Sequence, residues 1–254
     1  MATIGIMDSG SGGLSVLREI LRLLPAERYL YYSDNANCPY GEKTPEFIIG
    51  RCREIVRGFL AEGADAVVIA CNTATAAAIA TLRAEWPEVP FVGMEPAVKP
   101  AALGTRSGVV GVLATAGTLK ASKYLDTRNH YAGDVKVVER VGKGFVELVE
   151  DLELDGPHAE EVVRKSIEPL LRAGADTVVL GCTHYPFLLP VLRRIAGPDV
   201  RFIDPAPAAA RQLARLLDSR GIPHSGPDSP ARADVTIKSS GQSETARRIL
   251  SLIL

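Results

Sequence analysis

The chain has 254 residues, of which 46% are hydrophobic and 23% charged, values that are typical of a globular enzyme with a sizeable core. Its formal net charge of −1 gives no electrostatic reason to expect nucleic acid or an anionic membrane as a partner. The first residues lack the basic and apolar segments of a secretory signal, and no apolar run approaches the ~18 residues of a membrane span. We therefore expect a cytoplasmic protein with reduced thiols.

Short β-branched runs alternate with amphipathic stretches along the chain, which predicts parallel sheets with crossover helices. In a first set we expect strands over residues 3–7, 29–33, 66–70 and 89–93, and helices over 14–24 and 46–62. In a second set we expect strands over 108–113, 135–141, 177–180 and 200–203. We expect helices that follow the turn 114–118 and run through Tyr124, that span 145–152 and that span 158–173. A helix over 208–217, a surface loop over 225–234, a strand over 235–238 and a helix over 244–254 follow.

The two sets repeat the same order of strand, turn and helix. Asp8 precedes Cys71 by 63 residues, and Thr115 precedes Cys182 by 67, as the numbering gives directly. We interpret the chain as a duplicated α/β fold of two pseudo-symmetric parallel-sheet domains. Residues 1–95 with 206–254 form the first expected domain and residues 96–205 the second, with the active site in a cleft between them.

Each set contains a strand that ends in a cysteine. ADAVVIACNTATAAA (64–78) carries Cys71, and ADTVVLGCTHYP (175–186) carries Cys182. Ligands of open α/β sheets bind at the carboxyl ends of the strands, so both thiols stand where a ligand would bind. A single buried cysteine is usually an inert core residue, which is our expectation for Cys52 on an apolar helix face. Two thiols at matched positions favour catalysis instead, while Cys38 in a loop receives no assigned role.

Two opposed thiols suit acid–base chemistry, because a thiolate can take a proton and a thiol can return one. A free cysteine has a pKa near ~8.5, so neighbouring groups must help to form the thiolate. Asp8 could orient Cys71 or bind a substrate ammonium group; the alternative, which is less favoured, is that it caps a helix. His184 follows Cys182 by two residues and is its expected partner.

Further polar groups suggest that the ligand carries a carboxylate. The loop Gly10–Gly13 could offer backbone N–H groups to an anion, but it lacks the lysine of a P-loop and the spacing of a dinucleotide fingerprint. The Pro39-Tyr40-Gly41 segment could frame one end of a pocket. Each hydroxyl taken singly is also explained by turn chemistry. Candidate carboxylate contacts are Ser9, Asn72, Thr73, Thr115, Thr118 and Thr183.

Four motifs together resemble the glutamate racemase family: DSGSGG at 8–13, CPYGEKT at 38–44, ACNTAT at 70–75 and GCTHYP at 181–186. The resemblance runs from the first strand to about Asp204. It implies a homodimeric isomerase, independent of cofactors and metals, that interconverts L- and D-glutamate and supplies D-glutamate for peptidoglycan, and hence for cell-wall biogenesis and cell shape. In aspartate racemases the position of His184 is more often Glu.

The resemblance also implies roles for individual residues. Cys71 would act on D-glutamate and Cys182 on L-glutamate, with Asp8 and His184 assisting. Glu150 matches an acidic helper, although a solvated helix carboxylate explains it equally well. Implied substrate contacts are Asp8, Ser9, Tyr40, Gly41, Asn72, Thr73, Thr183 and His184. The chain departs from the family pattern at Asn37, where a basic residue is usual, at Gly142-Lys143, where Cys-Pro is usual, and at Ala121, where Ser is common.

Two alternatives stay open. An aspartate racemase, or another two-cysteine isomerase of the same superfamily, would keep both thiols and change the pocket. A redox-sensing binding protein would use the thiols as a switch. A pyridoxal-phosphate racemase is disfavoured, because no lysine stands at the end of a motif-bearing strand.

Overall fold

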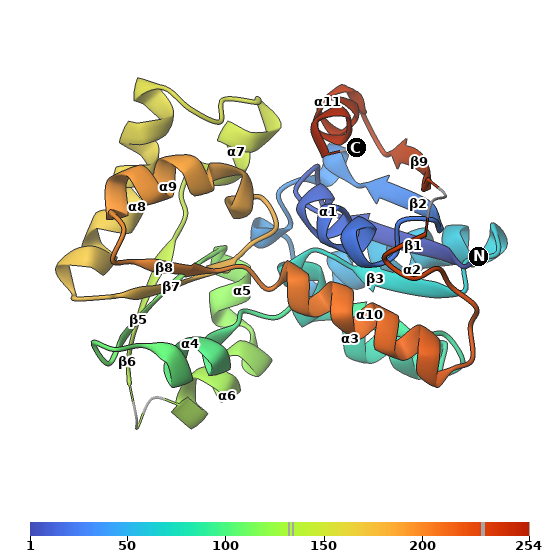
Figure 1. Ribbon diagram of the computed structural model, residues 1–254, viewed down its shortest axis with the longest axis horizontal. Helices are drawn as coiled ribbons and strands as arrows, with labels where there is room; N and C mark the ends of the chain where they lie inside the picture. The colour runs from blue at the N-terminus through green and yellow to red at the C-terminus, as the bar shows by residue number, and fades with distance from the viewer. Residues whose placement is uncertain (132, 134, 230–231, 254) are drawn as a thin grey trace. The chain divides into compact units, whose positions relative to one another are not determined.

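A computed structural model describes residues 1–131, 133, 135–229 and 232–253 (Figure 1). The chain forms two compact units, one from Met1–Met94 with Ala206–Leu254 and the other from Glu95–Pro205. Each unit is built around its own parallel sheet with helices on both faces, which confirms the expected fold class. Within the described residues, no helix combines the length and apolar character needed to span a membrane.

The first unit contains a five-stranded sheet in the order β4-β3-β1-β2-β9. Its strands are β1 (Thr3–Asp8), β2 (Arg28–Ser33), β3 (Ala66–Ile69), β4 (Phe91–Gly93) and β9 (Asp234–Ser239). Helices α2 and α3 pack together on one face, and α1 packs with α10 and α11 on the other (Figure 1). The helices are α1 (Leu14–Leu23), α2 (Pro45–Ala61), α3 (Asn72–Glu85), α10 (Ala206–Ser219) and α11 (Glu244–Ile253), and the 3₁₀ turns are η1 (Asn35–Asn37) and η2 (Tyr40–Glu42).

The core of the first unit shows why α2 lies where it does. Thr44 caps the helix by accepting a hydrogen bond from the Phe47 backbone N–H, and Pro45 supplies the first helical residue. Phe59 then packs over β1, where Gly5 leaves the room: a Cβ at Gly5 would lie 2.5 Å from Cδ2 of the Phe59 ring. Cys52 is fully buried in the same core, as the sequence predicts.

The second unit contains a four-stranded sheet in the order β6-β5-β7-β8. Its strands are β5 (Val109–Ala114), β6 (Lys136–Val141), β7 (Thr177–Gly181) and β8 (Arg201–Ile203). Helices α8 and α9 lie together on one face and α4 and α6 on the other (Figure 1). The helices are α4 (Val98–Gly104), α5 (Ala116–Lys120), α6 (Ser122–Tyr131), α7 (Phe145–Glu150), α8 (Pro157–Arg172) and α9 (Leu189–Ala196), with the 3₁₀ turn η3 (Tyr185–Leu188).

The two sheets repeat one topology. Taken from one edge, β4-β3-β1-β2 in the first sheet corresponds strand for strand to β8-β7-β5-β6 in the second, and β9 is an addition beside β2. Cys71 follows β3 and Cys182 follows β7, so the two thiols stand after equivalent strands. The duplication that the sequence predicts is therefore present in the strand order.

Local differences from the predicted elements have identifiable causes. The helix expected through Tyr124 is two helices, because Ala121 adopts an extended conformation (ψ 135°) that ends α5. The helix expected over 145–152 ends at Glu150, since Leu152 has a left-handed φ of 59°. Helices α3, α4 and α9 were not predicted as separate elements. Residues 230 and 231 of the expected loop and residue 254 of the expected last helix lie outside the described residues.

Candidate active site

Cys71 stands at the junction between β3 and the 14-residue helix α3, where it is the N-cap residue. The Ala74 backbone N–H donates to its Sγ at 3.4 Å, and the thiol donates to Ser9 Oγ at 3.6 Å. Its side chain is buried, as is that of Ser9. The N-terminus of a helix stabilises negative charge, so this position favours the thiolate form of Cys71.

Asp8 ends β1 in the same unit and is fully buried. Its carboxylate accepts a hydrogen bond from the Gly10 N–H at 3.0 Å, so this N–H is already used within the loop that was expected to bind an anion. The N-cap residue of α1 is Gly13, which rules out the alternative that Asp8 caps this helix. A Cβ at Gly13 would lie 2.7 Å from the Cβ of Asp8, so glycine is required for this close approach.

Asn72 and Thr73 open α3 directly after Cys71, and both are buried. Among the described residues, neither the amide nitrogen nor the amide oxygen of Asn72 has a hydrogen-bond partner. Burying such a group unpaired costs about 1–3 kcal/mol, so an unpaired buried amide calls for a functional explanation. Asn72 therefore has both a donor and an acceptor available for a ligand.

Tyr40 and Gly41 lie in the 3₁₀ turn η2, in the loop between β2 and α2. The Tyr40 ring is buried, and its hydroxyl donates to Asp34 Oδ2 at 2.5 Å. Asp34, which was not predicted as a site residue, is fully buried and directly follows β2. A carboxylate at the end of a buried strand was the signal that could have identified it.

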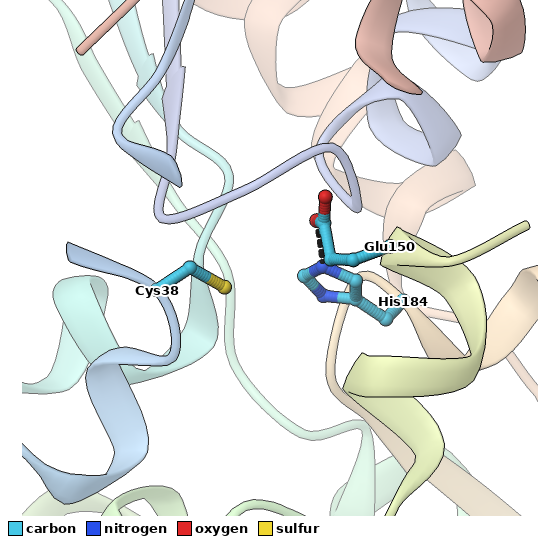
Figure 2. A group of neighbouring side chains, drawn as sticks. All are labelled: Cys38, Glu150 and His184. Atoms are coloured by element: carbon cyan, nitrogen blue, oxygen red, sulfur yellow. Dashed lines mark hydrogen bonds and ion pairs between the residues drawn. The ribbon is translucent and has the colours of Figure 1, made fainter. Parts of the chain in front are cut away.

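Cys182 begins the corresponding turn in the second unit, where His184 and Glu150 accompany it. Its Sγ lies 3.7 Å from His184 Nδ1, and His184 Nε2 lies 2.8 Å from Glu150 Oε1, the pair drawn with a dashed line in Figure 2. The His184 side chain is 2% exposed and that of Glu150 22% exposed. In the tautomer with the proton on Nε2, His184 donates to Glu150 and the Nδ1 lone pair faces the Cys182 thiol. The structure thus joins the three predicted residues in one chain of contacts, and Glu150 is not merely a solvated carboxylate.

Tyr185 holds this turn against the segment that carries Glu150. The fully buried Tyr185 ring packs edge-on against Phe145, with ring centroids 4.9 Å apart, and its hydroxyl donates to the Gly142 carbonyl at 3.4 Å. A Cβ at Gly142 would lie 2.6 Å from the Tyr185 hydroxyl, which explains the glycine at this departure from the family pattern. Burial, reinforced by the nearby Cys182, raises the pKa of Tyr185 well above its usual value, so the phenol stays a hydrogen-bond donor.

The three threonines of the second unit that were predicted to contact the ligand, Thr115, Thr118 and Thr183, differ in their surroundings. Thr115 caps α5: its Oγ1 accepts from the Thr118 N–H at 3.3 Å and lies 3.0 Å from the Thr118 hydroxyl. Turn chemistry therefore accounts for this contact, as the sequence analysis allowed. Thr183 is buried, and it lies between Cys182 and His184 in the sequence. It therefore belongs to the turn that carries the second thiol.

Comparisons with known proteins agree with these features. The Asp/Glu/Hydantoin racemase family model matches residues 4–213. A glutamate racemase of Pseudomonas putida (strain W619) is 52% identical over 252 residues, which cover 99% of this chain and 94% of that protein. The crystal structure of Escherichia coli glutamate racemase in complex with L-glutamate and the activator UDP-MurNAc-Ala is 35% identical, with a TM-score of 0.86 over 99% of this chain and 95% of that chain.

A second solved structure, glutamate racemase from Francisella tularensis in complex with D-glutamate, is 25% identical, with a TM-score of 0.82 over 100% of this chain and 93% of that chain. Nearly full-length agreement in both sequence and structure shows the family. The chain belongs to the Asp/Glu/Hydantoin racemase family of isomerases, as a relative of its glutamate racemases.

Proposed function

We propose that the chain interconverts L- and D-glutamate without a cofactor, with Cys71 and Cys182 as the two acid–base groups. The observation that carries the proposal is the pair of thiols that follow equivalent strands of two sheets with the same strand order. The relatives named glutamate racemase, and the solved relatives in complex with L- and D-glutamate, support glutamate as the substrate.

Inversion at Cα requires removal of a proton from one face and delivery of a proton to the other. In the direction from L- to D-glutamate, the Cys182 thiolate takes the Cα proton and becomes a thiol. The Cys71 thiol then protonates the opposite face of the carbanionic carbon and becomes the thiolate. The reverse direction begins from this second protonation state, so each thiol is the base in one direction and the acid in the other.

The remaining predicted residues bind the substrate and stabilise the developing carbanion, an effect that lowers the barrier only if it is stronger in the transition state. Asp8 provides a buried negative charge for the substrate ammonium group, and the unpaired Asn72 amide provides a donor and an acceptor. His184, held by Glu150, exchanges the proton with Cys182. The other proposed substrate contacts are Ser9, Tyr40, Gly41, Thr73, Thr115, Thr118 and Thr183.

The domain assignment belongs to the same proposal. Residues 1–95 with 206–254 would supply Cys71 and its neighbours, and residues 96–205 would supply Cys182 and His184, so that each domain acts on one face of glutamate. We further propose that the enzyme works as a homodimer in the cytoplasm and supplies D-glutamate for peptidoglycan.

Loss of the circular dichroism signal of L-glutamate, compared with L-aspartate under identical conditions, tests the proposed substrate. We expect the signal of glutamate to decay to zero and that of aspartate to persist. The converse result would make the chain an aspartate racemase. No decay with either amino acid, combined with reversible oxidation of Cys71 and Cys182, would instead support a redox-sensing binding protein.

A further inference from the structure

The Asp34 carboxylate is the centre of a buried hydrogen-bond cluster at the start of the loop between β2 and α2. We call Asp34, Asn37, Tyr40, Arg51 and Ser240 the Asp34 cluster. Arg51 of α2 binds both carboxylate oxygens, with Nη2 2.8 Å from Oδ1 and Nε 3.0 Å from Oδ2. Asn37 Nδ2 lies 3.1 and 3.2 Å from the two oxygens, and the Tyr40 hydroxyl lies 2.5 Å from Oδ2.

The charge of Asp34 is maintained by these contacts. Burial alone would raise the pKa of the carboxyl, but hydrogen bonds from Arg51, Tyr40, Ser240 and Asn37 outweigh burial and lower it below its usual value. A buried carboxylate that loses its cationic partner leaves an uncompensated charge, which is strongly unfavourable. Arg51 is therefore the residue on which the ionised cluster depends, and its side chain is only 19% exposed.

The turn that follows β9 holds the same loop from its other side. Ser240 Oγ accepts from the Ala36 N–H at 3.1 Å. Asn35 Oδ1 accepts from the Ser239 hydroxyl at 2.6 Å and from the Gly241 N–H at 3.0 Å. The loop is thus fixed by α2 through Arg51 and by the turn after β9 through Ser239–Gly241.

The hydroxyl of Tyr40 is committed to Asp34 and its ring is buried, so Tyr40 and Gly41 can meet a substrate through their backbone groups. The position of those backbone groups follows from where the ring is anchored. We propose that Arg51 is a positioning residue that fixes Tyr40 and Gly41 for substrate binding, acting through Asp34. This inference rests on the proposed function, in which Tyr40 and Gly41 contact glutamate.

Arg53 offers a matched control on the same helix. It also makes an ion pair with both oxygens of a carboxylate, with its Nε 2.8 and 3.0 Å from the oxygens of Glu85, but this pair is more exposed and its partner belongs to α3. Lysine keeps the charge at either position and loses the planar fork that binds both carboxylate oxygens. The substitutions Arg51→Lys and Arg53→Lys therefore change the same chemistry in two different places.

The experiment measures kcat and KM for both enantiomers of glutamate in wild type, Arg51→Lys, Arg53→Lys, Tyr40→Phe and the double variant Arg51→Lys/Tyr40→Phe. We expect Arg51→Lys to raise KM about 10-fold with a smaller change in kcat. This pattern is expected when a variant weakens binding of the substrate and of the transition state equally. Arg53→Lys should match wild type. Arg51 acts through Asp34 and the Tyr40 hydroxyl, and Tyr40→Phe removes that hydroxyl. The double variant should therefore have a KM less than about 2-fold above that of Tyr40→Phe alone. Such non-additive effects are expected of residues in one hydrogen-bond network.

Additive effects in the double variant, or an unchanged KM in Arg51→Lys, would overturn the inference while leaving the proposed function intact. Absence of glutamate turnover in wild type would overturn the proposed function and this inference with it. If Arg51→Lys does not fold, Ser240→Ala probes the cluster from the other side. It should raise KM a few-fold, and an unchanged KM there also counts against the inference.

Discussion

The surroundings of Cys71 and Cys182 differ although the strands before them are equivalent. Cys71 is the N-cap of a 14-residue helix and has a backbone N–H and a serine hydroxyl beside its sulfur. Cys182 is followed by the short turn η3 and has an imidazole beside its sulfur, backed by a carboxylate. The strands that precede the two thiols are thus equivalent, while the groups beside the two sulfur atoms differ between the units.

This difference cannot appear as a difference in kcat/KM between the two directions. Enantiomers have equal free energies, so the equilibrium constant of racemisation is one, and kcat/KM must be equal for L- and D-glutamate in any variant. The asymmetry must instead appear in which proton transfer limits the rate, and isotope effects measured separately in each direction report that step.

The largest expected effect comes from removing either thiol. Cys71→Ser and Cys182→Ser should each lower kcat by about 10³-fold, within the roughly 10²–10⁴-fold contribution of a general acid or base. Circular dichroism measures racemisation, and NMR in D₂O measures deuterium incorporation at Cα. Near-wild-type turnover in either variant contradicts the two-thiol mechanism. The core variant Cys52→Ala is the control: it should remain active with a Tm lower by about 2–4 °C.

Removal of the imidazole should affect only the second thiol. We expect His184→Asn to lower kcat about 10²-fold, because Cys182 loses the group that exchanges its proton. The Cys182 step then becomes more rate-limiting, so the primary isotope effect with Cα-deuterated L-glutamate should exceed that with Cα-deuterated D-glutamate. Equal isotope effects in the two directions would contradict the assignment of His184 to Cys182.

A smaller effect is expected from Gly142→Ala, which tests whether Tyr185 holds the second half of the site together. The new methyl group would meet the Tyr185 ring, and overpacking of this kind costs about 1–3 kcal/mol. Urea unfolding measures the loss. Gly50→Ala is the control, because among the described residues a Cβ there would meet no atom within 4 Å beyond its chain neighbours and the adjoining backbone of its own helix, and alanine favours the helix. Equal stability of the two variants would show that Tyr185 can move without cost.

The smallest effect concerns the acid stability of the second unit. Asp176 precedes β7 and accepts hydrogen bonds from the Thr105 hydroxyl and the backbone N–H groups of Arg106 and Ser107, at 2.6, 2.7 and 2.8 Å. Burial opposes ionisation, but these bonds lower the pKa of Asp176 from 3.8 to about 2. The stabilisation is therefore complete above pH 3.8 and is lost as the pH falls towards 2.

Acid unfolding followed by circular dichroism checks this prediction. Asp176→Asn should be less stable than wild type at neutral pH, and the difference should shrink as the pH falls from about 4 to 2. A difference that is independent of pH would show that the carboxylate charge of Asp176 does not contribute.

The sequence predicts those features that depend on neighbouring residues. Apolar runs that end in a cysteine place both thiols at strand ends, and the two-residue spacing places His184 beside Cys182. The contact of Glu150 with His184 depends on packing, because Tyr185 and Gly142 bring together segments 34 residues apart. The position of Asp34 after a buried strand is visible in the sequence, but its pairing with Arg51 depends on how α2 packs on the sheet, and no local pattern in the sequence predicts that contact.

The route of the chain through the first unit has a consequence for synthesis. The chain leaves this unit after Met94 and returns at Ala206, and β9, which covers the edge of β2, begins only at Asp234. At about 5–20 residues per second, the ribosome leaves β2 without this neighbour for on the order of 10 s. The second unit, continuous in sequence, is complete before then. We therefore expect the second unit to fold first. The first unit reaches its native state last, although its residues 1–94 are synthesised earliest.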